Sequence, residues 1–253
     1  MIIRESENSF IMVAQHDHAS LSGQIAAHFK KEFFIEEVFF DDVVLAVQEH
    51  DRSWIGLDDT PLWNDRRLEP ISFMDYPKIP KLTFYSAGLD ETEIMNPYAA
   101  LLCSLHYTSF YAHSQDKEIT QFLNNERERQ SRIMATVPHI SEKTISYHFR
   151  LLQLCDDLSL YVCLNEPGVS KEEEHKWYRK GFKNSEIFSV NHEFIKAEWK
   201  SKQHVSIHDF PFEQDFQAQI AIKHILKSER DKEGVEQAYH QAELNIQPIW
   251  FIR

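Results

Sequence analysis

The period of the hydrophobic pattern changes once along the chain, and this change constrains the fold more than any other feature. Up to about residue 164 the apolar residues recur at helical spacing, as in Leu151, Leu154, Cys155 and Leu158. Beyond about residue 183 short alternating runs predict strands: SEIFSV, EFIKAEW, HVSIHDF, FQAQIAIKHI and NIQPIWFI. A block of helices followed by a block of strands is typical of the α+β class.

We therefore expect one α+β domain over residues 1–253, with a helical core at about 18–164 and a β-rich region at about 183–253. The apolar run SFIMVA near the N-terminus predicts an early strand. That strand could complete an antiparallel sheet formed by the C-terminal third. Helices are expected at about residues 19–31, 36–50, 98–114, 117–134 and 142–164, the last with Ser141 as N-cap.

Two stretches break this pattern. Between Arg52 and Pro97 the sequence is punctuated by tryptophan, aspartate, glycine and four prolines, which predicts a long loop that covers a site. Residues 94–115 carry no Lys, Arg, Asp or Glu, but they contain eight interrupting residues that are polar or proline. A buried helix explains that composition better than a membrane span.

Composition excludes several classes of function. Six glycines are too few and too scattered for a G-x-G-x-x-G or P-loop nucleotide site. A net charge of −13 argues against a nucleic-acid partner bound by bulk charge. The three cysteines are odd in number and lie in apolar surroundings, and the N-terminus lacks the pattern of a secretory signal. We expect a cytoplasmic protein that binds no membrane; the sequence leaves its oligomeric state open.

Four sites, five residues in all, carry metal-compatible side chains at helix ends or inside apolar helices: His18, the adjacent pair His50 and Asp51, His106, and Asp156. Metal sites are built from imidazoles and carboxylates that converge in this way. Asp156 is the most informative, because it interrupts the apolar run LLQLCDDLSLYVC, and a buried carboxylate needs a partner.

The order of these residues resembles the metal-dependent phosphohydrolases of the HD-domain superfamily. In those proteins a helical bundle holds one divalent metal ion through a lone His, an adjacent His-Asp pair and a distal Asp. The resemblance implies that His18 in QHDHASLSGQIA, His50 and Asp51 in EHDRSW, and Asp156 in LQLCDDLSL are the metal ligands. The segment RSWIG after the pair departs from many relatives, which have a small turn toward Gly-Lys there.

Most of the chain is still more similar to a bacterial family catalogued only as a domain of unknown function. The shared features are QHDHA-x-LSG, HD-x-x-W, an apolar helix with a central His, and CD-x-LSL. This family implies no activity. The superfamily resemblance therefore carries the functional expectation alone.

Each candidate also has a structural explanation. His18 could cap its helix, His50 and Asp51 could be a solvated helix C-terminus, and His106 could be a hydrogen-bonded core residue. The motif His16-x-His18 after a strand would alternatively fit a barrel hydrolase of the amidohydrolase type, but the helical middle of the chain lacks the strands that a barrel needs. The occurrence of His18, His50, Asp51 and Asp156 together, in the order that resembles the HD-domain superfamily, favours a metal site.

The sequence thus predicts a metal-dependent hydrolase of a small phosphorylated substrate. His18, His50, Asp51 and Asp156 would bind a divalent ion, with Mn, Fe, Co or Ni preferred over Ca by this mixed donor set. Asp51 is also expected to orient water, and His106 to contact the substrate phosphate, support a ligand or bind a second ion together with His113 on one helix face. A non-catalytic metal-binding sensor or interaction protein on the same scaffold remains the alternative.

Overall fold

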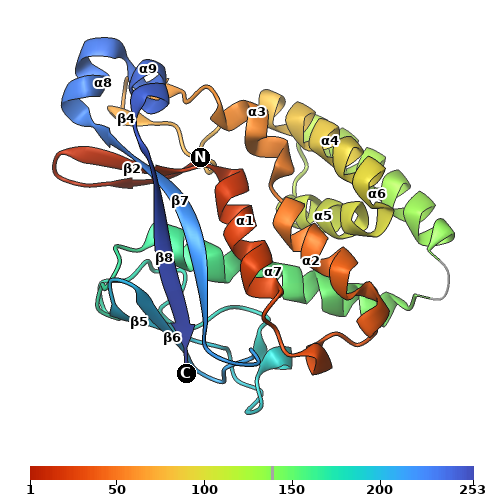
Figure 1. Ribbon diagram of the computed structural model, residues 1–253. Coiled ribbons are helices and arrows are strands. Elements are labelled where there is room, and N and C mark those ends of the chain that lie inside the picture. The colour runs from red at the N-terminus through yellow and green to blue at the C-terminus, as the bar shows by residue number, and fades with distance from the viewer. Residues whose placement is uncertain (138–139) are drawn as a thin grey trace.

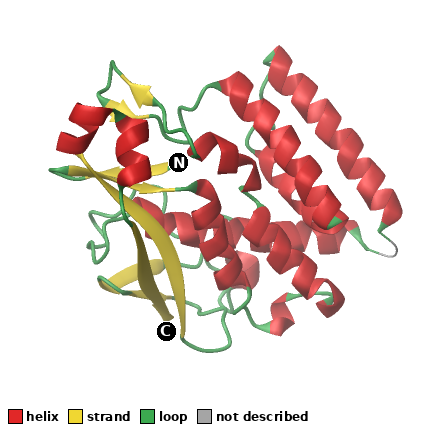
Figure 2. Ribbon diagram, turned by 45° about the horizontal axis from the view of Figure 1, so that its top comes forward, coloured by secondary structure: helices red, strands yellow, loops and turns green. Residues whose placement is uncertain are grey.

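Most of the helices lie on one side of the molecule and the six-stranded sheet lies on the other. The computed structural model describes residues 1–137 and 140–253, and Figure 1 shows a long twisted pair of strands, β7 and β8, beside a group of helices. Figure 2 shows the same separation with strands gathered on one side. The α+β prediction is confirmed at this level, since the fold combines a helical layer with a six-stranded sheet.

The sheet joins both ends of the chain, as predicted. Its strands lie in the order β1-β2-β7-β8-β6-β5. Their bounds are Ile2–Glu5 (β1), Ser9–Val13 (β2), Phe216–Leu226 (β7), Leu244–Ile252 (β8), His204–Ile207 (β6) and Ala197–Ser201 (β5). The prediction of a purely antiparallel sheet is wrong, because β8 inserts between β7 and β6 and therefore runs parallel to β6.

Helix α7 (Glu142–Leu164) is the central helix of the helical layer and contacts α1 (Gln15–Ala26), α2 (Phe40–Glu49), α5 (Pro97–Ser109) and β1. Its bounds agree with the sequence prediction, and the Ser141 side chain accepts a hydrogen bond from the Thr144 N–H, as an N-cap does. Helix α6 (Lys117–Thr136) packs on the far side of α5.

Helix α1 joins the helical layer to the sheet. The Gln24 side chain accepts a hydrogen bond from the Gln219 N–H at 2.9 Å and donates one to the Gln219 carbonyl at 3.0 Å. These two bonds satisfy backbone groups of β7 that a neighbouring strand would otherwise pair. They also fix α1, which carries His18, against the sheet.

The predicted loop between Arg52 and Pro97 is largely ordered secondary structure, so that prediction is wrong. It contains η3 (Arg52–Trp54), α3 (Ile55–Asp58), a ribbon of β3 (Trp63–Asn64) and β4 (Glu69–Pro70), and α4 (Lys78–Met95). Pro77 precedes α4 and Pro80 lies in its first turn, where a missing N–H breaks no helical hydrogen bond. These prolines start a helix rather than exclude one.

A close approach fixes α4 beside the segment that follows Asp51. A Cβ atom at Gly88 would lie only 2.6 Å from the Cα of Ser53, so glycine lets α4 pack directly on η3. Helix α4 also contacts α5 and α6. It is therefore part of the helical layer, and its first turns form a wall of the site described below.

The β-rich region contains fewer strands than the sequence predicts. Residues 185–190 were expected to be a strand but include the 3-10 helix η4 (Glu186–Phe188), and residues 193–199 contribute only the start of β5. Strand β1 and the short helices α8 (Lys227–Glu233) and α9 (Val235–Gln241) were not predicted. Alternation over a few residues is too short a signal to separate a strand from a tight turn.

The uncharged run lies mostly in α5, a helix whose first eleven residues are nearly all buried. Among the described helices, none combines the length and the apolar character that crossing a bilayer demands. Cys103, Cys155 and Cys163 are buried and unpaired, in agreement with the absence of a disulfide framework.

Candidate metal centre

Five side chains meet between the helices, and we call them the His/Asp cluster: His18, His50, Asp51, His106 and Asp156. His18 lies in the first turn of α1, His50 ends α2, Asp51 precedes η3, His106 is on α5 and Asp156 is on α7. The three histidines are buried, and the side chains of Asp51 and Asp156 are 7% and 13% exposed.

The donor atoms of the cluster lie close together. Nε2 of His18 lies 3.2 Å from Nε2 of His50 and 3.1 Å from Oδ1 of Asp156. The His50 Nε2 atom is 3.4 Å from the same Asp156 oxygen. Oδ2 of Asp51 completes the group at 3.5 Å from His18 Nε2 and 3.7 Å from His50 Nε2.

These separations fit a single metal ion. Bonds of about 2.0–2.2 Å place neighbouring donors about 3.0–3.5 Å apart around an octahedral or tetrahedral ion. The five distances above span 3.1–3.7 Å. Among the described residues, the donor atoms of His18, His50 and Asp51 lie within 4.8 Å of one another and could hold an ion, and those of His50, His106 and Asp156 form a second such group that shares His50.

Hydrogen bonds orient the two closest imidazoles. His50 Nδ1 donates to the carbonyl oxygen of Val47 at 2.7 Å, which assigns its proton to Nδ1. His18 Nδ1 contacts the Ser159 hydroxyl, and that hydroxyl donates to the Asp156 carbonyl. Both Nε2 atoms then present lone pairs to each other at 3.2 Å, an arrangement that is unfavourable unless a cation or proton lies between them.

Electrostatics in the cluster favour bound positive charge. Burial lowers the pKa of the His18 imidazole, but hydrogen bonds to Asp156 and Asp51 outweigh it and raise that pKa well above its ordinary value. Burial raises the pKa of Asp156, but His18 and His50 hold it well below its usual range. The pKa of Asp51 is lowered by His50 and His18 in the same way, against the effect of burial. Both carboxylates are therefore charged.

His106 differs from the other two histidines. Burial lowers its pKa to about 4, so the imidazole is neutral near pH 7. Its Nε2 lies 3.5 Å from Oδ2 of Asp156, the oxygen that faces away from His18 and His50. Its Nδ1 is buried and has no hydrogen-bond partner among the described residues. His106 lines the same pocket as His18, Asp51 and Asp156.

His113 does not join the cluster. The sequence placed it on one helical face with His106, but α5 ends at Ser109 and His113 is exposed. The seven-residue spacing therefore no longer corresponds to two helical turns, and the predicted pairing of His106 with His113 is wrong.

A pocket of about 360 Å³ opens onto the cluster. His18, Asp51, His106 and Asp156 line its polar end, together with Gln15, Lys81 and Asp157. The remaining wall is mostly aromatic or apolar and includes Phe73, Tyr85, Phe110, Tyr111, Leu160 and Trp177. A largely apolar pocket with a few polar side chains is typical of small-molecule sites.

Sequence reasoning missed several residues of this site. Gln15 donates from Nε2 to Oδ2 of Asp51 at 3.0 Å, and Ser159 anchors His18. Ser159 had a signal, since it lies one helical turn after Asp156 in an otherwise apolar run. Lys81 and Tyr85 were missed because α4 was interpreted as loop.

Three residues that follow His50 and Asp51 in the sequence lie in different environments. Trp54 lines the pocket. Asp58 is buried and accepts a hydrogen bond from the Gln15 N–H at 2.7 Å, whereas Asp59 is exposed. His16 is absent from the groups of residues that could share an ion, and the open six-stranded sheet excludes an amidohydrolase-type barrel.

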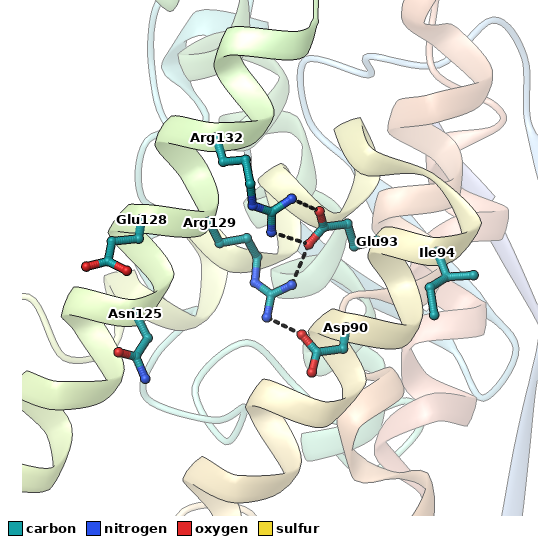
Figure 3. Close-up of a pocket in the computed structure, with 7 residues that line it drawn as sticks. All are labelled: Asp90, Glu93, Ile94, Asn125, Glu128, Arg129 and Arg132. Atoms are coloured by element: carbon teal, nitrogen blue, oxygen red, sulfur yellow. Dashed lines mark hydrogen bonds and ion pairs between the residues drawn. The ribbon is translucent and has the colours of Figure 1, made fainter.

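A second and larger hollow lies between α4 and α6, where Figure 3 shows Arg129 and Arg132 facing Asp90 and Glu93. Dashed lines join Arg129 to both acids and Arg132 to Glu93. Each acid in these pairs faces a guanidinium, so the hollow is bordered by neutralised surface groups. It offers no cluster of reactive side chains.

Comparison with known proteins gives a family but no activity. A family described as a protein of unknown function (DUF3891) matches residues 1–227. The chain belongs to this family. The matched region contains all five members of the His/Asp cluster and ends just after β7. No curated protein and no solved structure gives a significant match to the chain.

Proposed function

We propose that this DUF3891 protein is a metal-dependent hydrolase that acts on a phosphate ester. The observation that carries the proposal is that the carboxylates of Asp51 and Asp156 each lie 3.1–3.7 Å from the Nε2 atoms of His18 and His50, beside a pocket that His18, Asp51 and Asp156 line. Their order along the chain is the one that resembles HD-domain phosphohydrolases. We accordingly propose that α1, α2, α5 and α7 form an HD-like bundle.

The chemistry of the donors suits a transition metal. Two imidazoles and two carboxylates favour Mn, Fe, Co or Ni over Ca, which prefers six to eight oxygen ligands. When bound, such an ion polarises a phosphoryl oxygen and lowers the pKa of a coordinated water.

The protein's own residues have distinct roles in this proposal. The Gln15 side chain holds Asp51 by its hydrogen bond to Oδ2, so Asp51 can orient water at the phosphorus atom while also serving as a ligand. His106 lines the same pocket with a neutral imidazole, whose single N–H can donate one hydrogen bond to a phosphoryl oxygen. The pocket walls exclude most bulk water from these groups.

The test combines elemental analysis with activity. Protein purified without chelator should contain close to one equivalent of a transition metal, and it should hydrolyse generic phosphate esters when Mn is supplied. Asp51→Asn should abolish activity, while Asp59→Asn, an exposed neighbour outside the cluster, should retain both metal and activity. His106→Ala should lower turnover with metal retained, and His113→Ala should match the wild type.

Two outcomes would contradict the proposal. Unchanged metal content in His50→Ala and Asp51→Asn would remove the cluster as the metal site. A filled site without activity on any phosphorylated substrate would instead support a non-catalytic metal-binding sensor.

A further inference from the structure

The mouth of the pocket is lined by exposed apolar side chains. Met74, Phe110 and Trp177 are 56%, 54% and 44% exposed, although each lines the pocket. They come from three separate segments: the loop before α4, the end of α5 and the loop after α7. Apolar side chains around a polar cavity lose contact with water only when an apolar group is bound between them.

Lys81 supplies a cation to the lining of the pocket. It lies in the first turn of α4 and lines the same pocket. Its ammonium group donates one hydrogen bond, to the Phe73 carbonyl at 3.3 Å, and it takes part in no ion pair among the described residues. An ammonium group has three donors, so Lys81 can contact a bound anion without breaking an existing salt bridge.

The charges around the pocket limit the anion that fits. Asp51 and Asp156 contribute two negative charges, a divalent ion would offset both, and Lys81 adds one positive charge. Asp157 also borders the pocket and adds negative charge when ionised. This balance suits one phosphoryl group, whereas a triphosphate would bring several unmatched negative charges into the same space.

The volume of the pocket also favours a small ligand with one phosphoryl group. A volume of about 360 Å³ lies near the lower end of the range of about 300–1,000 Å³ for small-molecule sites. It accommodates one phosphoryl group and a compact alcohol portion, with any longer apolar extension passing between Phe110 and Trp177.

We propose that the ligand is a small phosphate monoester of an apolar alcohol, with Lys81 contacting the phosphoryl group and Trp177 and Phe110 flanking the alcohol portion. The inference rests on the proposed function for its turnover step. In that step the oxygen of water forms a bond to phosphorus, the ester P–O bond breaks, and one water proton passes to the released alcohol. The products are inorganic phosphate and the free alcohol.

Binding and turnover are measured on a matched pair. Glycerol 3-phosphate and 2-phenylethyl phosphate are both esters of primary alcohols, so they differ mainly in the polarity of the alcohol portion. Their non-hydrolysable phosphonate analogues report binding by calorimetry on the Mn-loaded protein, independently of catalysis. We expect the phenylethyl compound to bind at least tenfold more tightly. Equal affinities, tighter binding of the glycerol compound, or no binding of either would overturn the inference.

Two variants separate the two ends of the pocket. Lys81→Met should weaken both phosphonates by about tenfold or more, because it removes a charge-assisted hydrogen bond. Trp177→Ala should weaken only the phenylethyl compound, by about fivefold, because it removes an apolar contact. Lys143→Met and Phe194→Ala replace an exposed lysine and a similarly exposed aromatic residue outside the pocket, and they should bind like the wild type.

These measurements distinguish failure of the inference from failure of the proposed function. Selective binding of the phosphonate, without turnover of either ester or of any generic phosphate ester, would overturn the hydrolase proposal and leave the ligand assignment standing. Turnover of both esters with equal kcat/KM would leave the hydrolase standing and overturn the assignment. Wild-type affinity in Lys81→Met, with metal content and thermal stability unchanged, would remove Lys81 from phosphate recognition.

Discussion

Two clusters of acidic side chains in the helical layer have different partners: arginines in one cluster and histidines in the other. In the hollow between α4 and α6, Arg129 and Arg132 face Asp90, Glu93 and the buried Glu126. The His/Asp cluster has two carboxylates but only imidazoles opposite them. Guanidinium groups stay charged at any accessible pH, whereas imidazoles are charged only when protonated.

The difference separates a structural cluster from a candidate site. The arginine cluster, defined by Arg129, Arg132, Asp90, Glu93 and Glu126, is complete without any ligand, because its acids have permanent cations as partners. The carboxylates of the His/Asp cluster obtain a partner only by taking up protons or a cation. A buried group of acids without permanent cations is thus the better indicator of a binding site.

The variant with the largest expected effect tests the His/Asp cluster. His50→Ala should reduce bound metal from about one equivalent to nearly none, because it removes the buried imidazole central to both donor groups. At metal concentrations 100 to 1,000 times Kd, it should also remove about 3–4 kcal/mol of ligand-linked stability. Elemental analysis and thermal unfolding with and without chelator measure both. Glu93→Gln in the arginine cluster is the control, and loss of metal from that variant would break the comparison.

A second variant tests the arginine cluster. Arg129→Met removes the guanidinium that contacts Glu126, Glu93 and Asp90, and it leaves Glu126, which is 1% exposed, with Ser104 as its remaining polar partner. Removing one partner of a buried pair costs about 3 kcal/mol of unfolding free energy. Denaturant unfolding should show that loss with metal content unchanged. A stable variant would mean that the cluster contributes little to the fold.

The smallest effect concerns a histidine that belongs to neither cluster. His148 lies on α7 two turns before Asp156, where burial lowers its pKa to about 4 and Tyr98 contacts its Nδ1 at 2.7 Å. The unfolded chain binds this proton more tightly, so stability is lost as pH falls from about 6.5 to 4. Between pH 7 and pH 5 the contribution is about 2 kcal/mol.

The measurement compares wild type with His148→Gln at both pH values. The variant should lose about 2 kcal/mol less unfolding free energy than the wild type on this change of pH. Both proteins are kept in chelator, so the metal does not contribute to the difference. Equal losses would show that His148 is already protonated, or solvated, in the fold.

Local signals explain which parts of the fold were predictable. The bounds of α7 follow from its period and from Ser141, both of which act within a few residues. The five cluster positions were visible because His18, His50 and Asp51 were expected at helix ends, and because His106 and Asp156 interrupt apolar helices. Helix α4 was missed because prolines in the middle of a helix break it, and the sequence was interpreted in that way. Pro77 and Pro80 instead lie at the start of α4, where proline is tolerated.

Features that depend on distant residues were not predictable. The parallel pairing of β6 with β8 joins segments separated by some forty residues, and no local pattern specifies it. Gln15 and Ser159 acquire their roles only when α1, α7 and the segment after α2 are brought together. Likewise, Arg129 is the centre of an ion-pair cluster only because α4 brings Asp90 and Glu93 next to it.

The position of β8 inside the sheet has a consequence for how the protein is made. Residues 244–252 leave the ribosome after every other strand, yet they form the bridge between β7 and the β5–β6 hairpin. Until they arrive, β7 and β6 each have an unpaired edge that another nascent chain could occupy. The interval between synthesis of β7 and synthesis of β8, which α8 and α9 fill, is therefore the period of greatest exposure to aggregation.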